Sequence, residues 1–195
     1  EDVLPYFRRS EDQARGGDDF HGEGGELAVS DLSDNHPLCD AFIAAAEQVG
    51  IPRSRDFNGP VQEGAGYYQL TSRNGVRCSA ARAFLRPALK RPNVQLRTRA
   101  HVARVLFEGR RAVGVELVTG EGRERIRAGR EVILAAGAIN SPQLLELSGI
   151  GDAERLRGLG IDVVQDLPAV GENLQDHYQV RHVLRASRPV KLNDQ

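Results

Sequence analysis

The feature that most constrains this fold is the segment 131–137, in which an unbroken apolar run from Val132 to Ala136 ends at Gly137 and a helical pattern follows directly. A continuous apolar run that ends in glycine is typical of a strand buried on both faces, as in parallel sheets. Ser141 is then predicted to cap a helix whose first position is Pro142, because proline loses no needed hydrogen bond there. Leucines supply the apolar stripe of this helix, and Gly149 is placed to end it. The pattern predicts a strand and helix unit of an α/β fold.

The junction of this strand with its helix, Ala136-Gly137, suits a bound dinucleotide. In doubly wound sheets, ligands lie beyond the carboxyl ends of the strands, and a glycine there lets a cofactor approach the backbone. The helix N-terminus adds free N–H groups and the positive end of the helix dipole. Plain packing explains a strand that ends in Ala-Gly equally well, so this pattern alone leaves both interpretations open.

The rest of the chain divides into a loop-rich part and a sheet. Glycines and Asn-Gly pairs separate short patterned segments over the first hundred residues or so, which indicates loops carried on a scaffold. Two helices are predicted within this part, one over 37–49 and one that starts near Ser79 and ends before Pro87. The apolar face expected of the first helix comprises Leu38, Ala41, Phe42, Ala45 and Val49.

A change to period-two alternation begins at Val94 and predicts a sheet. Turn-forming residues separate the alternating runs, so we expect an antiparallel meander with one solvated face. After the segment 131–149, a short amphipathic helix is predicted over 152–159. The expected strands of the meander cover residues 94–98, 102–107, 113–117 and 123–128.

The composition excludes several classes of function. The 26 basic and 27 acidic residues are well mixed and give a net charge of -1, so no basic face is offered to nucleic acid or anionic lipid. No apolar run approaches the roughly 20 residues that cross a bilayer. The two cysteines lie far apart and indicate a reducing compartment, interpreted as the cytoplasm. The chain has no methionine, so we expect the gene product to start before Glu1.

Signals for other kinds of catalytic or metal site are weak. The five histidines are scattered, and none has metal-ligand spacing with Cys or a carboxylate, so no metal site is predicted. His177 ends an Asn-Leu-Gln-Asp-His segment, and a structural role bonded to Asp176 or to backbone is favoured over a chemical one. Ser141 lies in Asn-Ser-Pro rather than in a GxSxG elbow, so a capping role is favoured over that of a hydrolase nucleophile.

The full string Gly137-Ala-Ile-Asn-Ser-Pro-Gln-Leu-Leu-Glu-Leu-Ser-Gly-Ile-Gly151 resembles the glucose-methanol-choline (GMC) oxidoreductase family, above all its choline dehydrogenase-like and other alcohol dehydrogenase members. That family carries Ser/Thr-Pro, a pair of aliphatic residues and Ser-Gly-aliphatic-Gly at this spacing. Other segments similar to the family follow in the same order: Leu4-Pro5-Tyr6-Phe7, His21-Gly22, Asp56-Phe57-Asn58-Gly59, Arg77 to Ser79, Arg91-Pro92-Asn93, Arg130-Glu131-Val132, Leu167-Pro168 and Gly171 to His177.

The resemblance implies a mixed α/β fold that binds FAD: part of an FAD-binding doubly wound domain with an antiparallel meander, plus part of a substrate-binding domain. It implies that residues 1–93 link these domains, that 94–178 belong to the FAD-binding domain, and that 179–195 begin the return into the substrate domain. Val102 is alternatively an ordinary core residue of a strand. The cofactor contacts that the resemblance implies are Val102, through its backbone near the adenine, Ala136, Gly137, Asn173, Asp176 and His177.

The implied reaction is oxidation of a primary alcohol, choline-like or other, to an aldehyde by hydride transfer to the flavin. Electrons would then pass to oxygen or to a separate acceptor. The family's catalytic histidine would lie beyond Gln195, and its GxGxxG phosphate loop has no counterpart here, because pairs such as Gly22-Glu-Gly24 lack the third glycine. We therefore predict an internal part of the enzyme that has no catalytic base and binds FAD weakly on its own.

Two other classes of protein share some of these sequence features. A non-catalytic relative that acts as a binding module is the alternative, since it would keep the fold and lack the flavin or the base. A nicotinamide-dependent dehydrogenase would need a complete glycine fingerprint and an acidic ribose ligand about 20 residues on, and neither is present.

Overall fold

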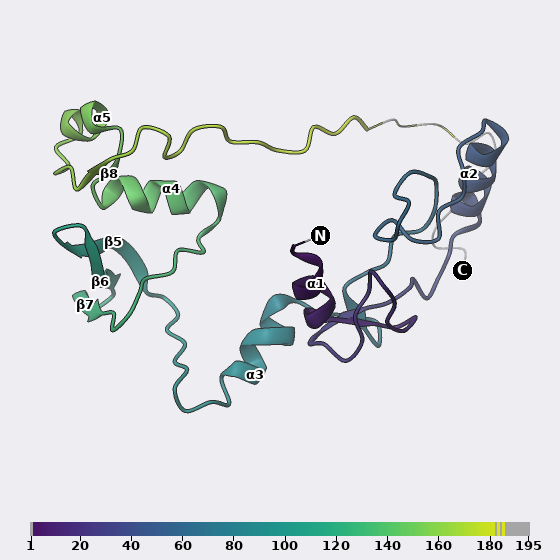
Figure 1. Cartoon of the computed structure of the whole chain (residues 1–195), viewed down its shortest axis with the longest axis horizontal. Coiled ribbons are helices and arrows are strands. Elements are labelled where there is room, and N and C mark those ends of the chain that lie inside the picture. The colour runs from purple at the N-terminus through teal and green to yellow at the C-terminus, as the bar shows by residue number, and fades with distance from the viewer. Residues whose placement is uncertain (1, 182, 184, 186–195) are drawn as a thin grey trace. The chain divides into compact units, whose positions relative to one another are not determined.

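The computed structural model describes residues 2–181, 183 and 185, which fall into two compact units. Unit 1 covers the described residues 2–96, and unit 2 covers Arg97–Arg185 (Figure 1). Helices and strands occur in both units, so the mixed α/β class is confirmed. Most of the predicted return segment 179–195 lies outside the described residues.

Unit 1 consists of short elements joined by loops, as its glycines predicted. Strands β1 and β2 pair in parallel, and β3 and β4 form an antiparallel hairpin. A small core forms from Ala28, Cys78 and Ala83, with Leu27 packed against it. The elements are α1 (Leu4–Ser10), β1 (Glu11–Gln13), β2 (Leu27–Val29), α2 (Pro37–Gln48), β3 (Ser72–Arg73), β4 (Val76–Arg77), the π-helical turn η1 (Ala81–Leu85) and α3 (Arg86–Ala88).

Helix α2 matches the predicted helix in extent but not in its buried face. Its N-cap is His36, whose ring accepts a backbone hydrogen bond. Ile43 and Ala46 are buried, whereas Phe42 is 72% exposed and Val49 is 75% exposed. The expected face was wrong because apolar residues surround most of this helix, and the neighbouring segments decide which of them become buried.

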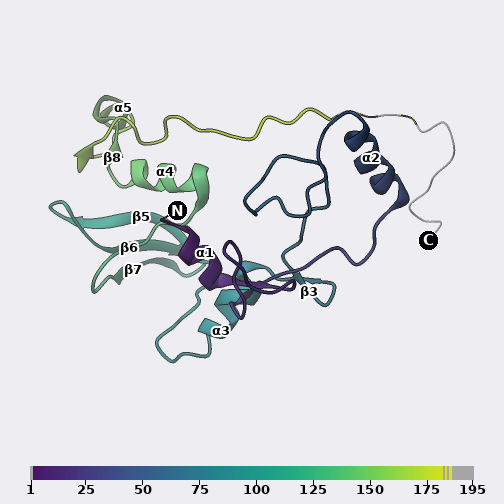
Figure 2. The same ribbon diagram turned by 45° about the vertical axis from the view of Figure 1, so that its right-hand side comes forward.

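Unit 2 contains the predicted meander as a three-stranded antiparallel sheet in the order β5-β6-β7. The strands are β5 (His101–Glu108), β6 (Arg111–Thr119) and β7 (Gly122–Arg127). Val105 and Leu117 are buried in this sheet, and α4 (Gly137–Leu147) lies beside β5 (Figure 2). Residues 94–98 form no strand with any described residue, so that prediction was wrong.

The predicted central strand and the start of its helix were also wrong. Residues 131–135 pair with no described strand, and Ile133 is 78% exposed. A central parallel strand needs a hydrogen-bonded neighbour on each side, and the described residues supply none. Helix α4 begins at Gly137, so Pro142 lies inside it. The Ser141 hydroxyl does not cap the start of the helix. It accepts a hydrogen bond from the backbone N–H of Ala136 (3.0 Å), which precedes Ser141 in the chain.

The Ser-Gly-Ile-Gly end of the string 137–151 forms a structural joint. Ser148 is buried, and its hydroxyl accepts a hydrogen bond from the Val105 backbone N–H (2.8 Å) and donates one to the Leu144 carbonyl (2.5 Å). Because β5 is an edge strand, this N–H has no partner strand on its outer side. Gly149 follows with φ +87°, which confirms its role in ending the helix. The joint therefore fixes the end of α4 to the sheet.

The segment after the joint folds back on it. β8 (Ile150–Gly151) pairs in parallel with β9 (Gln165–Asp166), and α5 (Ala153–Gly158) lies between them in sequence, within the predicted helix 152–159. Asp152 caps α5 by accepting the Arg155 backbone N–H (2.7 Å). The helix buries Leu156 completely.

Replacing Leu156 with alanine should lower the free energy of unfolding by about 2 kcal/mol, because it leaves a cavity in a packed site. Leu159→Ala is the matched control: it removes the same atoms from a side chain that is 66% exposed, and should change stability by less than about 0.5 kcal/mol. Urea unfolding of the complete gene product, followed by circular dichroism, measures both. Equal losses would contradict the burial of Leu156.

Candidate functional site

One pocket of unit 2, called the α4 pocket below, lies between the sheet and the segment that leads into α4. Its volume is about 440 Å³. Val102 and Val115 reach it from the neighbouring strands β5 and β6, and a run of α4 residues closes one side. It is lined by Ala100, His101, Val102, Val115, residues 132–136, Asn140, Gln143, Leu144 and Leu147.

The helical spacing of α4 explains its contribution to the pocket. Asn140, Gln143, Leu144 and Leu147 occupy positions i, i+3, i+4 and i+7, which share one face of an α-helix. That face presents two amides near the helix start and two leucines further along. The amides can donate and accept hydrogen bonds, and the leucines can cover apolar surface.

The α4 pocket is mainly apolar with a few polar groups. None of the described residues that line it is Asp, Glu, Lys or Arg. Such a lining suits a flat heterocycle held by a few hydrogen bonds better than it suits a bare charged group. Gly137, next to Ala136, has φ +86°, and a Cβ placed on it would meet no atom within 4 Å. The backbone at the start of α4 is therefore open to a ligand.

The structure brings together only part of the predicted cofactor set. Val102 and Ala136 line the α4 pocket, and Gly137 adjoins it in sequence. Asn173, Asp176 and His177 are exposed and do not line it. The His177 backbone N–H donates to the Asp176 carboxylate (2.7 Å), a contact that does not involve the His177 ring.

Three polar residues of the pocket were not predicted: His101, Asn140 and Gln143. The signal was the helical spacing that joins Asn140 to Gln143 and to the leucines. This spacing was not recognised because the predicted helix began only after Ser141. His101 directly precedes Val102 and carried no pattern of its own.

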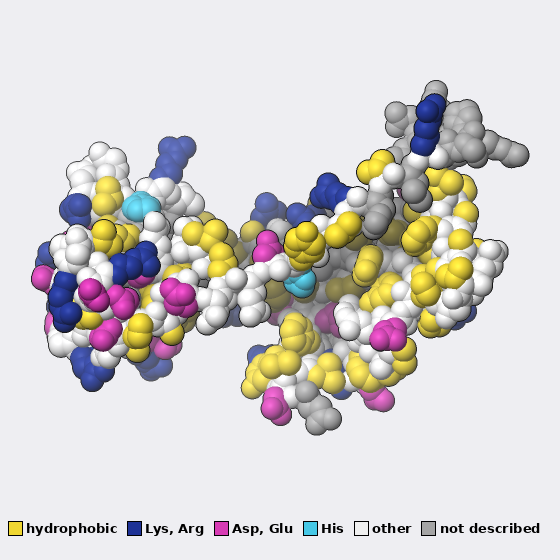
Figure 3. Space-filling view, turned by 90° about the horizontal axis from the view of Figure 1, so that it is seen from above, with side chains coloured by type: hydrophobic (Ala, Val, Ile, Leu, Met, Phe, Trp, Pro, Cys, Tyr) yellow, Lys and Arg dark blue, Asp and Glu magenta, His cyan; other side chains and the backbone are white. Residues whose placement is uncertain are grey.

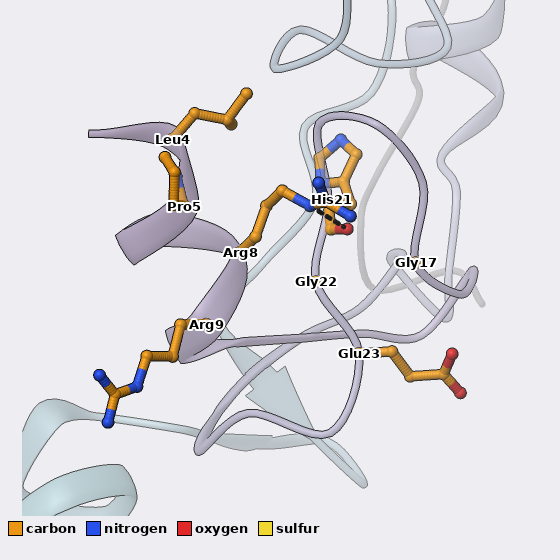
Figure 4. Close-up of a pocket in the computed structure, with 8 residues that line it drawn as sticks. All are labelled: Leu4, Pro5, Arg8, Arg9, Gly17, His21, Gly22 and Glu23. Atoms are coloured by element: carbon orange, nitrogen blue, oxygen red, sulfur yellow. Dashed lines mark hydrogen bonds between the residues drawn. The ribbon is translucent and has the colours of Figure 1, made fainter. Parts of the chain in front are cut away.

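A second pocket, in unit 1, adjoins a buried histidine (Figure 4). Its volume is about 600 Å³, and it lies between α1 and the loop that carries His21 and Gly22. Arg8 donates from Nε to the His21 carbonyl (3.3 Å). The Arg9 and Glu23 side chains point away from His21 in this view. The pocket is thus built against the backbone of the His21 loop.

His21 lies between two carboxylates, and Glu11, His21 and Asp56 are called the His21 cluster below. Its ring is held at Nδ1 by Glu11, at 3.1 Å from both carboxylate oxygens, and at Nε2 by Asp56 (2.8 Å). Glu11 also accepts the Gly22 backbone N–H (3.0 Å), and Gln13 Nε2 lies 3.3 Å from Nδ1. The histidine itself is only 5% exposed. Two segments 35 residues apart, both part of the family resemblance, therefore meet at one ion pair.

The surroundings of His21 favour its charged form. Burial lowers the pKa of His21, but the hydrogen bonds and negative charges of Glu11 and Asp56 outweigh that effect, so the pKa is raised above 6.5. A protonated ring donates from both nitrogens, one to each carboxylate. This arrangement ties β1 to two loops, which is a structural role.

The stability that His21 contributes should depend on pH. Because its pKa is raised on folding, the contribution is complete below pH 6.5, the ordinary value, and is lost as the pH rises through the folded-state pKa. Urea unfolding of the complete gene product between pH 5.5 and 9 should show this fall. At pH 6, His21→Leu should cost roughly 1–3 kcal/mol, since two carboxylates lose their partner.

The difference in stability between the wild-type protein and His21→Leu provides the decisive comparison for this cluster. It should be largest at the acidic end and shrink as the pH rises, because only the wild-type protein carries the imidazolium. A difference that stays constant with pH would show that His21 is neutral in the folded protein.

Figure 3 shows the charged and hydrophobic side chains on one face of the molecule. Lys and Arg side chains lie among Asp and Glu side chains on the face shown in Figure 3. In the described part of the chain, no helix is long and apolar enough to cross a membrane. No group of three or more His, Cys, Asp or Glu side chains among the described residues is arranged to hold a metal ion.

Relatives of known function match almost the whole chain. The family described as GMC oxidoreductase matches residues 1–179. The mitochondrial choline dehydrogenase of Homo sapiens is 50% identical over 190 residues, which are 97% of this chain and 32% of that protein. The oxygen-dependent choline dehydrogenase of Brucella ovis is 48% identical over 191 residues, 98% of this chain and 35% of that protein. The chain thus spans about a third of the length of these curated relatives.

Solved structures share the fold. Pyridoxine 4-oxidase from Mesorbium loti is 35% identical with a TM-score of 0.77, over 85% of this chain and 33% of that one. An FAD-dependent oxidoreductase from Chaetomium thermophilum is 29% identical with a TM-score of 0.79, over 86% of this chain and 32% of that one.

Proposed function

Because this chain belongs to the GMC oxidoreductase family, we propose that it is part of an FAD-dependent enzyme that oxidises a choline-like primary alcohol to an aldehyde. The observation that carries the proposal is the α4 pocket. It joins Val102 and Ala136 in one largely apolar site. A related structure is itself described as an FAD-dependent oxidoreductase.

The residues of the α4 pocket fit one end of a dinucleotide. Its apolar walls would cover a heterocycle, and the amides of Asn140 and Gln143 would bond to the ring edge. Ala136 and Gly137 offer backbone without a bulky side chain, and the start of α4 offers free N–H groups to a phosphate. We assign the backbone of Val102 to the adenine end.

The remaining predicted contacts belong to the same proposal. Asn173 has a left-handed backbone (φ +55°), and Asp176 and His177 are exposed, so all three side chains are available to a ligand. We assign residues 94–178 to the FAD-binding domain and residues 1–93 to the segment that links it to the substrate domain. The division of the chain between Leu96 and Arg97 supports this assignment.

The chain's part in the reaction is to hold and shield the cofactor. Bound FAD would supply the hydride acceptor for the alcohol carbon and the route by which electrons reach oxygen or a separate acceptor. The apolar lining of the α4 pocket excludes water from the group that it covers. We assign no described residue as the base that takes the hydroxyl proton.

Choline is the favoured substrate because the relatives named for it have higher identities, 50% and 48%, than the pyridoxine oxidase at 35%. For the location we favour the cytoplasm, since Cys39 and Cys78 are both free. The human relative is named as mitochondrial, and cell fractionation of the source organism would decide between the two compartments.

Anaerobic reduction of the complete gene product tests this function. Choline should bleach the oxidised flavin band at about 450 nm, whereas tetramethylammonium, which has the same cationic group and no hydroxyl, should leave it unchanged. A folded, flavin-loaded protein that neither choline nor other primary alcohols reduce would favour the alternative, a non-catalytic binding module.

A further inference from the structure

We propose that a pocket of unit 1 lined by three arginines binds the phosphate group of a small phosphorylated molecule. This arginine pocket has a volume of about 540 Å³. A volume of that size accommodates a small organic molecule and not only a bare ion. It shares no lining residue with the α4 pocket, so the proposal is independent of the proposed function. The lining residues are Arg15, Arg53, Ser54, Arg55, Gly66 and Tyr67.

The wall of the arginine pocket is held by backbone contacts. Arg53 and Ala65 form a parallel bridge, in which the Ser54 N–H donates to the Ala65 carbonyl (2.9 Å) and the Ala65 N–H donates to the Pro52 carbonyl (2.8 Å). A Cβ placed on Gly66 would lie 2.0 Å from the Ser54 carbonyl oxygen, so only glycine permits this approach. The two arginines next to Ser54 therefore project from a fixed segment.

Arg53 and Arg55 differ in their backbone setting. Arg53 forms the bridge itself, whereas Arg55 follows two residues later at a bend. The residue between them is turned to another partner, because the Ser54 hydroxyl donates to the Asp56 carbonyl (3.0 Å). Arg53 and Arg55 both contribute to the lining of the arginine pocket.

The third arginine is oriented by its own partners. Arg15 donates to both carboxylate oxygens of Asp31 (3.0 and 2.6 Å) and, through a further nitrogen, to the Arg55 carbonyl (2.7 Å). The two bonds to Asp31 neutralise the charge of Arg15. The third bond holds its side chain against the backbone of Arg55.

Arg53 and Arg55, in contrast, keep their charges uncompensated. Among the described residues, the ion pairs involve neither of them. Two further acidic groups lie near this site: Asp40, which accepts the Tyr67 hydroxyl (2.9 Å), and Asp56, which follows Arg55 and is held by His21 (2.8 Å). Two arginines that line one pocket without an ion pair among the described residues match the oxygens of a phosphate monoester, because each guanidinium group can donate two parallel hydrogen bonds.

Isothermal titration calorimetry of the complete gene product tests this site, with glycerol 3-phosphate as the probe. The wild-type protein should bind it. The double variant R53Q/R55Q should bind it at least roughly tenfold more weakly, because both guanidinium groups are lost. The variant R82Q/R86Q is the matched control, because it removes the same charge from exposed arginines of η1 and α3. That control should leave the affinity within about twofold, a change expected from net charge alone.

Co-sedimentation with phosphatidylcholine vesicles that contain phosphatidic acid identifies the source of the phosphate. Sedimentation that R53Q/R55Q abolishes would place the phosphate on a lipid headgroup, and titration without sedimentation would place it on a soluble molecule. The proposal is overturned if the wild-type protein binds neither probe, if R53Q/R55Q binds as tightly as the wild-type protein, or if R82Q/R86Q weakens binding equally.

Discussion

The complete gene product carrying Gly149→Ala should lose roughly 3–5 kcal/mol of its free energy of unfolding. Gly149 has φ +87°, a conformation that a residue with a Cβ adopts only with strain. A Cβ there would lie 2.3 Å from the Asp162 carbonyl oxygen and 3.1 Å from the Val164 backbone nitrogen. These are backbone atoms, and the Val164 N–H already donates to the Gly149 carbonyl (2.8 Å), so they cannot move aside without breaking the joint.

Gly158→Ala provides the matched control for this substitution. Gly158 ends α5 without a positive φ, and a Cβ on it would meet no atom within 4 Å. Alanine there should be neutral or stabilise by up to about 1 kcal/mol, through its higher helix propensity. Urea unfolding of both variants measures the contrast. If Gly149→Ala keeps its stability within about 1 kcal/mol of the wild-type protein, the fold of this joint is wrong.

A second large effect is expected at the cofactor. Ala136→Phe should weaken FAD binding by the complete gene product roughly 100-fold, about 2.7 kcal/mol, because the new ring would occupy the α4 pocket. The measurement is a titration of the protein, freed of its flavin, with FAD, followed by quenching of flavin fluorescence.

Ala138→Phe is the control for Ala136→Phe, with the same change of size two residues further into α4. Ala138 is exposed and does not line the α4 pocket. Its variant should bind FAD within a few-fold of the wild-type protein. Equal weakening by both substitutions would indicate general damage to α4 rather than a filled pocket.

Local signals were enough to predict those elements of the fold whose partners lie close in sequence. The meander was predicted because β5, β6 and β7 pair with their sequence neighbours, so alternation and turns specify it. The segment 131–137 has an equally strong apolar pattern, yet it forms no strand with the described residues. An apolar pattern indicates a tendency to be buried. A strand also needs neighbouring strands to hydrogen-bond with, and the pattern does not identify them.

Several side-chain positions differ from the predicted ones for a similar reason. The buried face of α2 depends on which neighbours pack against it, and sequence periodicity did not select Ile43 and Ala46 from so many apolar residues. Ser141 was a plausible helix cap on its own, but its hydroxyl bonds the Ala136 N–H. In the α4 pocket, Val102 and Ala136 were named through the family resemblance, whereas Asn140 became visible only once α4 was seen to begin at Gly137.

The string 137–151 that relates this chain to its family thus serves two purposes. Its first residues line or adjoin the α4 pocket, which we assign to FAD. Its last residues, Ser148 to Gly151, fix α4 to the sheet and to the segment that follows. Substitutions near its two ends should therefore have different consequences: loss of cofactor at Ala136, the residue just before the string, and loss of fold at Gly149.

The central claim, that this chain helps to hold FAD, is tested most directly by the flavin content of the purified complete gene product. Its absorbance spectrum should show an oxidised flavin band at about 450 nm, and mass spectrometry should identify FAD at about one molecule per polypeptide. A well-folded, colourless protein that takes up no FAD when the cofactor is supplied would contradict the account.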